Sequence, residues 1–221
     1  MDRSNVQELY TRRADAYLAF IGFFQSQRAL KRLVEKAVPL KSGLRVLDAG
    51  CGSGMADFAL IEALRRKSLD YERIDAFDVT PAMLSRFQAE LDSRGTKDVR
   101  LAEADVLDLD ALPATWTGYD LILSISVLEY LAKHDLPHAL AQLRERLAPG
   151  GRILVMITRK SPETKVFIEW AWRAERYTEN ELRRAFDAAR LNVRFLRFPL
   201  PFVWLNRANW VVLAGHSRFR K

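Results

Sequence analysis

Hydrophobic runs of strand length alternate with segments of helical periodicity through the middle of this chain. The strand-length runs lie at residues 44–47, 74–78, 99–102, 119–125 and 152–157, and the helical segments at 55–64, 81–93 and 135–147. The run at 119–125, YDLILSI, is almost continuously apolar, as in a parallel strand that is covered on both faces. Strands and helices that alternate in this way predict an α/β fold with a doubly wound parallel sheet.

Local signals mark several helix ends. Thr80 is expected to cap the helix at 81–93, with Pro81 at its first position. Thr178 and Glu181 have the spacing of a capping box, which predicts a helix at 179–190. The Pro-Gly-Gly sequence at 149–151 is expected to end the helix at 135–147 and to lead into the strand at 152–157.

The pattern changes on both sides of this region. Residues 5–36 are typical of helix in two pieces that meet near Gly22, and residues 161–176 carry large apolar side chains without a strand period. Two final strands are expected at 193–198 and 210–214. No Pro/Gly/Ser-rich linker divides the 221 residues, so we predict one domain over 1–221. Its parts are an N-terminal helical cap at 1–38, a core at 39–158, and a lid segment with a helix and two strands at 159–221.

Charge is uneven along the chain. The net charge of +7 divides into +3 for residues 1–36 (seven Lys/Arg, four Asp/Glu), −4 for 37–158 (fourteen, eighteen) and +8 for 159–221 (fourteen, six). The basic flanks suit an anionic partner such as nucleic acid, a lipid headgroup or an acidic substrate, or else form a solvated arginine-rich surface. The single cysteine, Cys51, and the lack of a leader or of an apolar run near ~18 residues favour a soluble cytoplasmic protein.

The candidate chemistry begins at the end of the first strand, where Asp48 is followed by Gly50, Gly52 and Gly54. Glycines let the chain turn tightly and let its backbone lie against a ligand. In open α/β sheets, ligands bind beyond the carboxyl ends of the strands. The spacing departs from the dinucleotide fingerprint, whose last glycine would fall on Met55, and no nucleoside triphosphate loop is present.

The sequence at 48–54, DAGCGSG, resembles the first motif of the class I S-adenosylmethionine-dependent methyltransferases. Three further segments are similar to the small-molecule enzymes of this superfamily: SISVLEYL at 124–131, LAPGGR at 147–152 and YTENEL at 177–182. The resemblance implies a Rossmann-like, seven-stranded sheet with an antiparallel last strand, helices on both faces and an N-terminal helical lid. It also implies that S-adenosyl-L-methionine is bound and S-adenosyl-L-homocysteine released.

The resemblance also implies roles for individual residues. Asp78, at the end of the second strand, would accept hydrogen bonds from both ribose hydroxyls, and Asp105 would accept one from the adenine amino group. The remaining cofactor contacts would come from Tyr10, Tyr17, Arg28, Asp48, Ala49, Gly50, Cys51, Gly52, Gly54, Val79, Met83, Ala104, Val106, Ser124, Ile125 and Glu129.

The N-terminal segment is informative about the acceptor. Residues 10–17, YTRRADAY, resemble the opening of the quinone-biosynthesis and phospholipid N-methyltransferases, in which tyrosines approach the methyl sulfonium. An aromatic face beside a cation is a favourable arrangement. Packing on the core is the alternative role for Tyr10 and Tyr17, and a surface position is the alternative for Arg28, which would otherwise bind the cofactor carboxylate.

Other classes of acceptor and of site fit the sequence less well. No N/D-P-P-Y-like turn follows the fourth strand, so methylation of an adenine or glutamine amine is not expected. No acidic or Cys/His cluster predicts a metal. Aromatic residues are concentrated in the segments expected to cover the pocket: Phe20, Phe23, Phe24, Phe167, Trp170, Trp172, Phe202 and Trp204. They predict a small lipophilic or aromatic acceptor, although packing in the core is their alternative role.

These observations lead to one preferred function and two alternatives. We expect O-, N- or C-methylation of the small acceptor, with Tyr17 near the transferred methyl and His134 as a candidate base; Glu129, Tyr130 and His138 are further candidates. The basic flanks could contact an anionic membrane, nucleic acid is not favoured as a partner, and a monomer or homodimer is expected. The alternatives are an RNA or protein methyltransferase that uses the basic flanks, and a non-catalytic cofactor-binding subunit.

Overall fold

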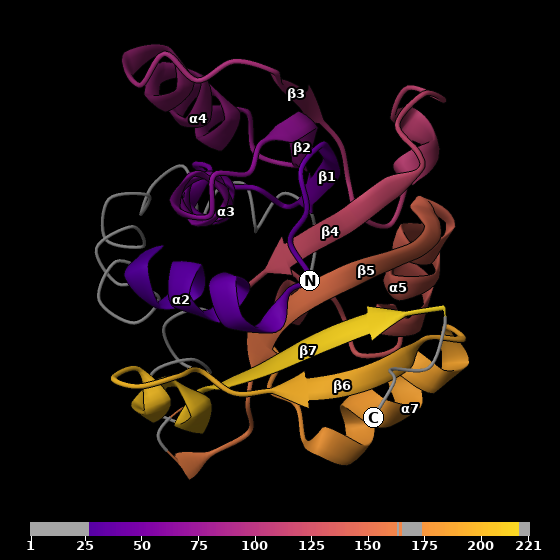
Figure 1. The fold of residues 1–221 in the computed structure, drawn as a ribbon. Helices are drawn as coiled ribbons and strands as arrows, with labels where there is room; N and C mark the ends of the chain where they lie inside the picture. The colour runs from indigo at the N-terminus through magenta and orange to yellow at the C-terminus, as the bar shows by residue number, and fades with distance from the viewer. Residues whose placement is uncertain (1–26, 163, 165–173, 217–221) are drawn as a thin grey trace.

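A seven-stranded mixed sheet forms the centre of the computed structural model, which describes residues 27–162, 164 and 174–216 (Figure 1). The strand order is β3-β2-β1-β4-β5-β7-β6, and β7 is antiparallel to both of its neighbours. This arrangement confirms the predicted Rossmann-like sheet with an antiparallel last strand. The strands are β1 (Leu44–Ala49), β2 (Tyr71–Asp78), β3 (Val99–Glu103), β4 (Tyr119–Ile125), β5 (Leu147–Thr158), β6 (Asn192–Leu196) and β7 (Asn209–Gly215).

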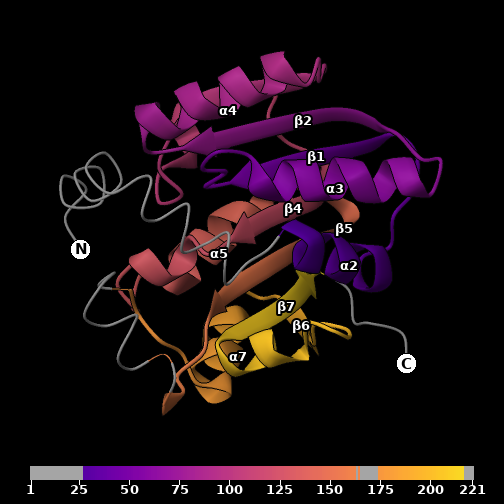
Figure 2. The same cartoon turned by 90° about the vertical axis from the view of Figure 1, so that its left-hand side faces the viewer.

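Helices cover both faces of the sheet (Figure 2). One apolar core contains side chains of α2 (Gln27–Ala37), α3 (Met55–Arg66) and α4 (Pro81–Ser93), and the other contains side chains of α5 (Leu136–Glu145) and α7 (Glu179–Ala188). Three single-turn elements follow strands or loops: η1 (Leu109–Ala111), η2 (Leu128–Tyr130) and η3 (Val203–Arg207). The predicted helical cap before residue 27 and most of the lid segment at 161–176 lie outside the described residues, so the division into cap, core and lid stays a prediction.

The helix starts agree with the local signals. The Thr178 hydroxyl accepts a hydrogen bond from the backbone N–H of Glu181 (3.3 Å), and the Glu181 carboxylate accepts one from the Thr178 backbone N–H (2.7 Å). This reciprocal pair is the predicted capping box. Thr80 occupies the N-cap of α4 with Pro81 after it, but its side chain makes no capping hydrogen bond.

The prediction of a helix at 135–147 is wrong at its C-terminal end. α5 stops at Glu145, and Leu147 begins β5, where it pairs with Tyr119. Arg146 accounts for this ending. Its guanidinium donates hydrogen bonds to the carbonyls of Leu109 and Trp116, which precede β4, and its own carbonyl accepts one from the Tyr119 backbone N–H. The Pro-Gly-Gly sequence therefore lies inside β5, at a shift of register with β4, and does not precede the strand.

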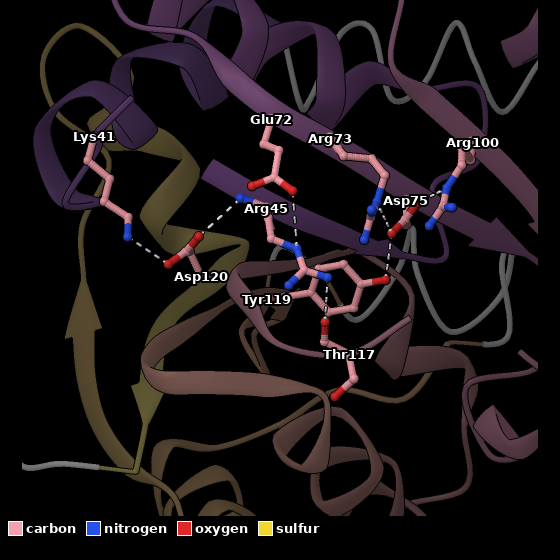
Figure 3. Close-up of polar contacts among 9 residues, drawn as sticks. All are labelled: Lys41, Arg45, Glu72, Arg73, Asp75, Arg100, Thr117, Tyr119 and Asp120. Atoms are coloured by element: carbon pink, nitrogen blue, oxygen red, sulfur yellow. Dashed lines mark hydrogen bonds and ion pairs between the residues drawn. The ribbon is translucent and has the colours of Figure 1, made fainter. Parts of the chain in front are cut away.

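A buried carboxylate ties β2, β3 and β4 together (Figure 3). Asp75 accepts hydrogen bonds from Arg100 Nε (2.6 Å), Arg73 Nε (2.9 Å) and the hydroxyl of Tyr119 (2.7 Å). Burial and the hydrogen bond to Asp75 raise the pKa of Tyr119, which keeps the phenol protonated as the donor. The same close-up shows the neighbouring contacts of Lys41, Arg45, Glu72, Thr117 and Asp120. Because Arg45 and Tyr119 stand at the starts of their strands, this network belongs to the edge of the sheet opposite the glycine-rich loop.

Candidate functional site

The three glycines after β1 have different surroundings. All three have positive φ angles, of +80° at Gly50, +54° at Gly52 and +82° at Gly54. A Cβ at Gly50 would overlap the side chain of Val127, and one at Gly54 would overlap the ring of Phe87. Among the described residues, no atom lies within 4 Å of a Cβ built on Gly52. Close packing therefore requires Gly50 and Gly54, whereas the described residues leave the Cβ side of Gly52 open, where a ligand can approach its backbone.

Asp78, the last residue of β2, is fixed against this loop. Its Oδ2 accepts a hydrogen bond from the backbone N–H of Gly52 (2.9 Å), and its Oδ1 accepts one from that of Thr80 (2.9 Å). The backbone N–H groups of Gly50 and Cys51 also donate to the carbonyl of Phe77, at 2.8 and 3.0 Å. The carboxylate is thus oriented before any ligand arrives.

A pair of buried carboxyls lies beneath the loop. Asp48 at the end of β1 and Asp57 in the first turn of α3 have exposed fractions of 1% and 0%. None of the four carboxyl oxygens accepts a hydrogen bond from a described residue, so two ionised groups here would bury like charges without a partner. Burial raises the pKa of both, that of Asp57 to about 7. Burial and the nearby aspartates also raise the pKa of Cys51, so this thiol stays protonated.

The residues expected around the adenine follow β2 and β3. Ala104 and Val106 are buried, and the carboxylate of Asp105 between them accepts a hydrogen bond from the Leu107 backbone N–H (2.9 Å). Ala104 donates its backbone N–H to the carbonyl of Asp78 (3.2 Å), which brings this segment beside the end of β2. Met83 in α4 is buried and Val79 is half-buried. The structure therefore gathers these five predicted contacts at one edge of the sheet.

The end of β4 contributes the other side of the site. The hydroxyl of Ser124 donates to the carbonyl of Ala49 (3.2 Å), which joins β4 to the start of the glycine loop. Ile125 ends the strand, and Ser126 then adopts a φ of +59°. A non-glycine residue in this region is uncommon and occurs often at functional sites. The turn directs the chain into η2, which carries Glu129.

Glu129 is a buried acid at the ends of β4 and β5. Its Oε1 accepts a hydrogen bond from the hydroxyl of Thr158 (3.0 Å), and its Oε2 is buried with no hydrogen-bond partner among the described residues. Burial raises its pKa to about 7, against the opposing effect of its hydrogen bonds. The hydroxyl of Tyr177 is likewise buried without a described partner, and burial together with the Glu129 charge raises its pKa. Both groups are buried at this end of the sheet, and the charge of Glu129 acts on the hydroxyl of Tyr177.

Four other sequence candidates are either exposed or outside the described residues. His134 is exposed over 84% of its side chain and lies 3.4 Å from Asp135. Arg28 is on the exposed side of α2, next to Gln27, which contacts Glu62 in the second half of α3. Tyr10 and Tyr17 precede the described residues. The catalytic and cofactor roles expected for these side chains stay predictions.

Sequence reasoning missed the partners of the predicted residues. Asp57 stands in an apolar helical segment, and a polar residue among Ala56, Phe58 and Ala59 was the available signal that it is buried. Val127, Thr158 and Tyr177 gave no comparable signal, because they reach Gly50 and Glu129 only through the packing of β4 and β5. Among the described residues, no group of three or more His, Cys, Asp and Glu side chains could hold a metal ion.

Residues 24–196 match the protein family described as the methyltransferase domain. The chain belongs to this family. It is 33% identical over 142 residues to malonyl-[acyl-carrier protein] O-methyltransferase of Halorhodospira halophila, an alignment that covers 64% of this chain and 43% of the relative. It is also 33% identical over 144 residues to demethylmenaquinone methyltransferase of Thermus thermophilus, with 65% and 60% covered. The chain thus spans about half the length of these curated relatives.

Solved methyltransferase structures have the same fold. Magnesium protoporphyrin IX methyltransferase from Synechocystis, solved with bound SAH, superposes with a TM-score of 0.73 at 15% identity, covering 98% of this chain and 100% of that one. A Haloferax volcanii methyltransferase chain, from a complex with the Trm112 activator, gives 0.71 at 22% identity, with 98% and 99% covered. Within the described part of this methyltransferase chain, no helix has the length and apolar character needed to cross a membrane.

Proposed function

We propose that this chain is an S-adenosylmethionine-dependent methyltransferase that acts on a small lipophilic or aromatic acceptor. The observation that carries the proposal is the oriented carboxylate of Asp78 beside the bare backbone of Gly52, in a chain of the methyltransferase family. The proposal covers O-, N- or C-methylation, because the acceptor atom is not identified by these residues.

The described residues fit the cofactor. The two oxygens of Asp78 face the backbone N–H groups of Gly52 and Thr80, and a carboxylate can also accept from the two hydroxyls of a ribose. Asp105 would bind the adenine amino group, with Ala104 and Val106 against the ring, and the open face of Gly52 would admit the methionine part. The half-buried carboxylate of Asp78 favours a ligand that carries positive charge, and the buried pair of Asp48 and Asp57 lies behind it.

When bound, the cofactor supplies a methyl group on a positively charged sulfur, which a nucleophilic acceptor displaces directly. The residues of the chain then need only hold the acceptor, exclude water and remove a proton where the acceptor carries one. We assign the last role to Glu129 in preference to His134, because Glu129 is buried at the carboxyl edge, has an oxygen with no hydrogen-bond partner among the described residues, and has a pKa of about 7. Tyr177 would bind a polar group of the acceptor.

The relatives support a small acceptor without identifying it. The names of the two curated relatives specify demethylmenaquinone and a malonyl group on acyl-carrier protein, and the Synechocystis structure is of a magnesium protoporphyrin IX enzyme. Demethylmenaquinone and a porphyrin contain large apolar parts, which agrees with the aromatic residues of the segments expected to cover the pocket, whereas a malonyl group is a small acid carried on a protein. The Trm112 complex raises an activating protein subunit as a further type of partner.

Calorimetric titration with S-adenosylmethionine tests the cofactor site. Asp78→Ala should weaken binding more than about tenfold, since it removes two charge-assisted hydrogen bonds to the ligand. Asp187→Ala is the matched control, because Asp187 is an exposed carboxylate on α7. Unchanged affinity in folded Asp78→Ala protein would refute the assignment.

Incubation with methyl-labelled cofactor and fractionated cell extract tests the acceptor class. Label should enter small organic molecules. Label in RNA or protein would instead support the macromolecular alternative, in which the basic flanks bind a polyanion. Cofactor binding without release of S-adenosylhomocysteine in any fraction would support the non-catalytic alternative.

A further inference from the structure

Three large apolar side chains are exposed in one short segment between β6 and β7. Leu200 is 79% exposed, Val203 47% and Trp204 44%, and these are the large hydrophobic residues exposed within the described part of the chain. Isolated exposed apolar residues are normal on a protein surface. Three of them within five residues form a patch, which marks an interaction surface. We call residues 197–208 the β6–β7 loop.

The β6–β7 loop has a defined conformation. Phe198 and Leu205 anchor it in the core with exposed fractions of 3% and 1%. Asn206 crosses the loop, because its Oδ1 accepts from the Phe198 backbone N–H (2.8 Å) and its Nδ2 donates to the Val203 carbonyl (2.9 Å). The Phe202 backbone N–H also donates to the Pro199 carbonyl (2.8 Å). The apolar side chains are therefore held outward by an ordered backbone.

The surroundings of this loop are basic. Residues 188–221 contain six arginines and one lysine and no Asp or Glu. Arg197 and Arg207, within the loop, are exposed. Arg159, which donates to the Asn206 carbonyl (3.0 Å), and the exposed Lys160 bring further positive charge from the end of β5. The apolar patch is thus flanked by cations, and no carboxylate of its own segment neutralises them.

The β6–β7 loop lies at the edge of the sheet that holds the candidate site. β6 is antiparallel to β7, which is antiparallel to β5, so β6 runs parallel to β1, β2 and β4 and ends at the same edge. Figure 1 shows the loop at the end of β6, on the side toward which β4 and β6 point. A surface that covered this loop would face the carboxyl ends of the strands.

We propose that the β6–β7 loop docks the protein on an anionic phospholipid bilayer, with Leu200, Val203 and Trp204 in the interfacial layer and the flanking arginines on the headgroups. A patch of three side chains is small for a stable protein interface, which buries about 800 Å² per partner, whereas interfacial binding needs only a few apolar residues and nearby positive charge. Tryptophan suits this depth, since it has an apolar body and a polar N–H. If the bilayer also supplies the acceptor, that role rests on the proposed function.

Vesicle sedimentation with the full chain tests the docking surface. The probes are vesicles of phosphatidylcholine alone and of phosphatidylcholine with phosphatidylglycerol, at low and high salt. The protein should bind the anionic vesicles, more weakly as salt rises. Leu200→Asp and Val203→Asp should each weaken binding about tenfold or more, because a charged group replaces an inserted apolar one. Arg207→Glu should weaken it at least fivefold at low salt.

Thr115→Asp is the matched control, since Thr115 is exposed in the loop before β4, at the opposite edge, and the change adds the same charge. It should leave vesicle binding within about twofold of the wild type. Equal binding by wild type and Leu200→Asp, an equal loss in Thr115→Asp, or no vesicle binding at all would each overturn the proposal. Saturable binding of an acidic soluble protein that Leu200→Asp abolishes, without vesicle binding, would overturn it in favour of a protein partner.

A parallel titration with S-adenosylhomocysteine separates this proposal from the proposed function. Leu200→Asp should bind this ligand as the wild type does, because Leu200 is 79% exposed and contributes no packing to the site. Failure of the cofactor titration alone would leave the docking result standing, and failure of the vesicle result alone would leave the cofactor site standing.

Discussion

The buried carboxyl pair makes a specific prediction for Asp57→Asn. The substitution keeps the shape of the side chain but replaces an acid by an amide, whose N–H₂ can donate to Asp48 without a shared proton. The wild-type pair must instead hold a proton or bury two like charges side by side. The variant should therefore be more stable than the wild type at neutral and alkaline pH.

The magnitude follows from the raised pKa of Asp57. A change from 3.8 to about 7 corresponds to about 4 kcal/mol, at 1.36 kcal/mol per unit, as an upper limit for a coupled pair. Since the folded form holds the proton more tightly than the unfolded chain, this stabilisation is complete below pH 3.8 and is lost as the pH rises through about 7. The free energy of unfolding of the wild type should fall over that interval, and the slope should be smaller in Asp57→Asn.

Urea denaturation followed by tryptophan fluorescence, at steps from pH 5 to 9, measures the difference. We expect Asp57→Asn to lie within about 1 kcal/mol of the wild type at pH 5 and to exceed it by a few kcal/mol at pH 8. Asp187→Asn, which removes an exposed carboxylate, should follow the wild-type curve at both ends. An Asp57→Asn protein that is less stable at pH 8, with the wild-type slope, would show that Asp48 and Asp57 do not share a proton.

Further substitutions probe the loop, the candidate base and a helix cap. Gly54→Ala should lower the free energy of unfolding in urea by about 3 kcal/mol, because its Cβ overlaps the buried Phe87 ring. Gly52→Ala should lower it by only about 1 kcal/mol but should weaken cofactor binding more than about tenfold in calorimetry, and a larger loss of stability in Gly52→Ala than in Gly54→Ala would contradict the assignment. Methyl transfer into organic-extractable products should rise with pH through about 7 in the wild type and be about 100-fold slower and flat in Glu129→Gln; a retained rise would exclude Glu129 as the base. Thr178→Ala should cost about 1 kcal/mol in thermal or urea unfolding by removing the capping box, and an unchanged midpoint would contradict that role.

Much of the fold could be predicted because its signals are local. The run at 119–125 coincides with β4, and the helix at 81–93 coincides with α4, because a continuous apolar stretch and a Thr-Pro start need no distant partner to be recognised. The glycine loop and Asp78 could also be predicted, because each directly follows or ends an apolar strand and the two strands are neighbours. These features fix the carboxyl edge of the sheet and the position of the candidate cofactor site.

The parts that escaped prediction depend on contacts between distant segments. Leu147 was expected in a helix because its pairing with Tyr119 is set by the sheet and not by its neighbours. The burial of Asp57 depends on the packing of α3 against the end of β1, where Asp48 lies. The position of the Glu129 carboxyl depends on its hydrogen bond from Thr158 in the next strand. A sequence pattern shows which side chains are polar, but only the assembled layers show which of them have lost water.

The position of β7 between β5 and β6 has a consequence for the order in which the sheet is completed during synthesis. β6 pairs with β7 alone among the described strands, and β7 follows it in the chain, so β6 and the outer edge of β5 have no partner until residues 209–215 leave the ribosome. An unpaired strand edge is a template for association with other chains. During synthesis the open sheet edge therefore persists until β7 is made. A chain that stopped before β7 would keep this edge exposed and would tend to aggregate.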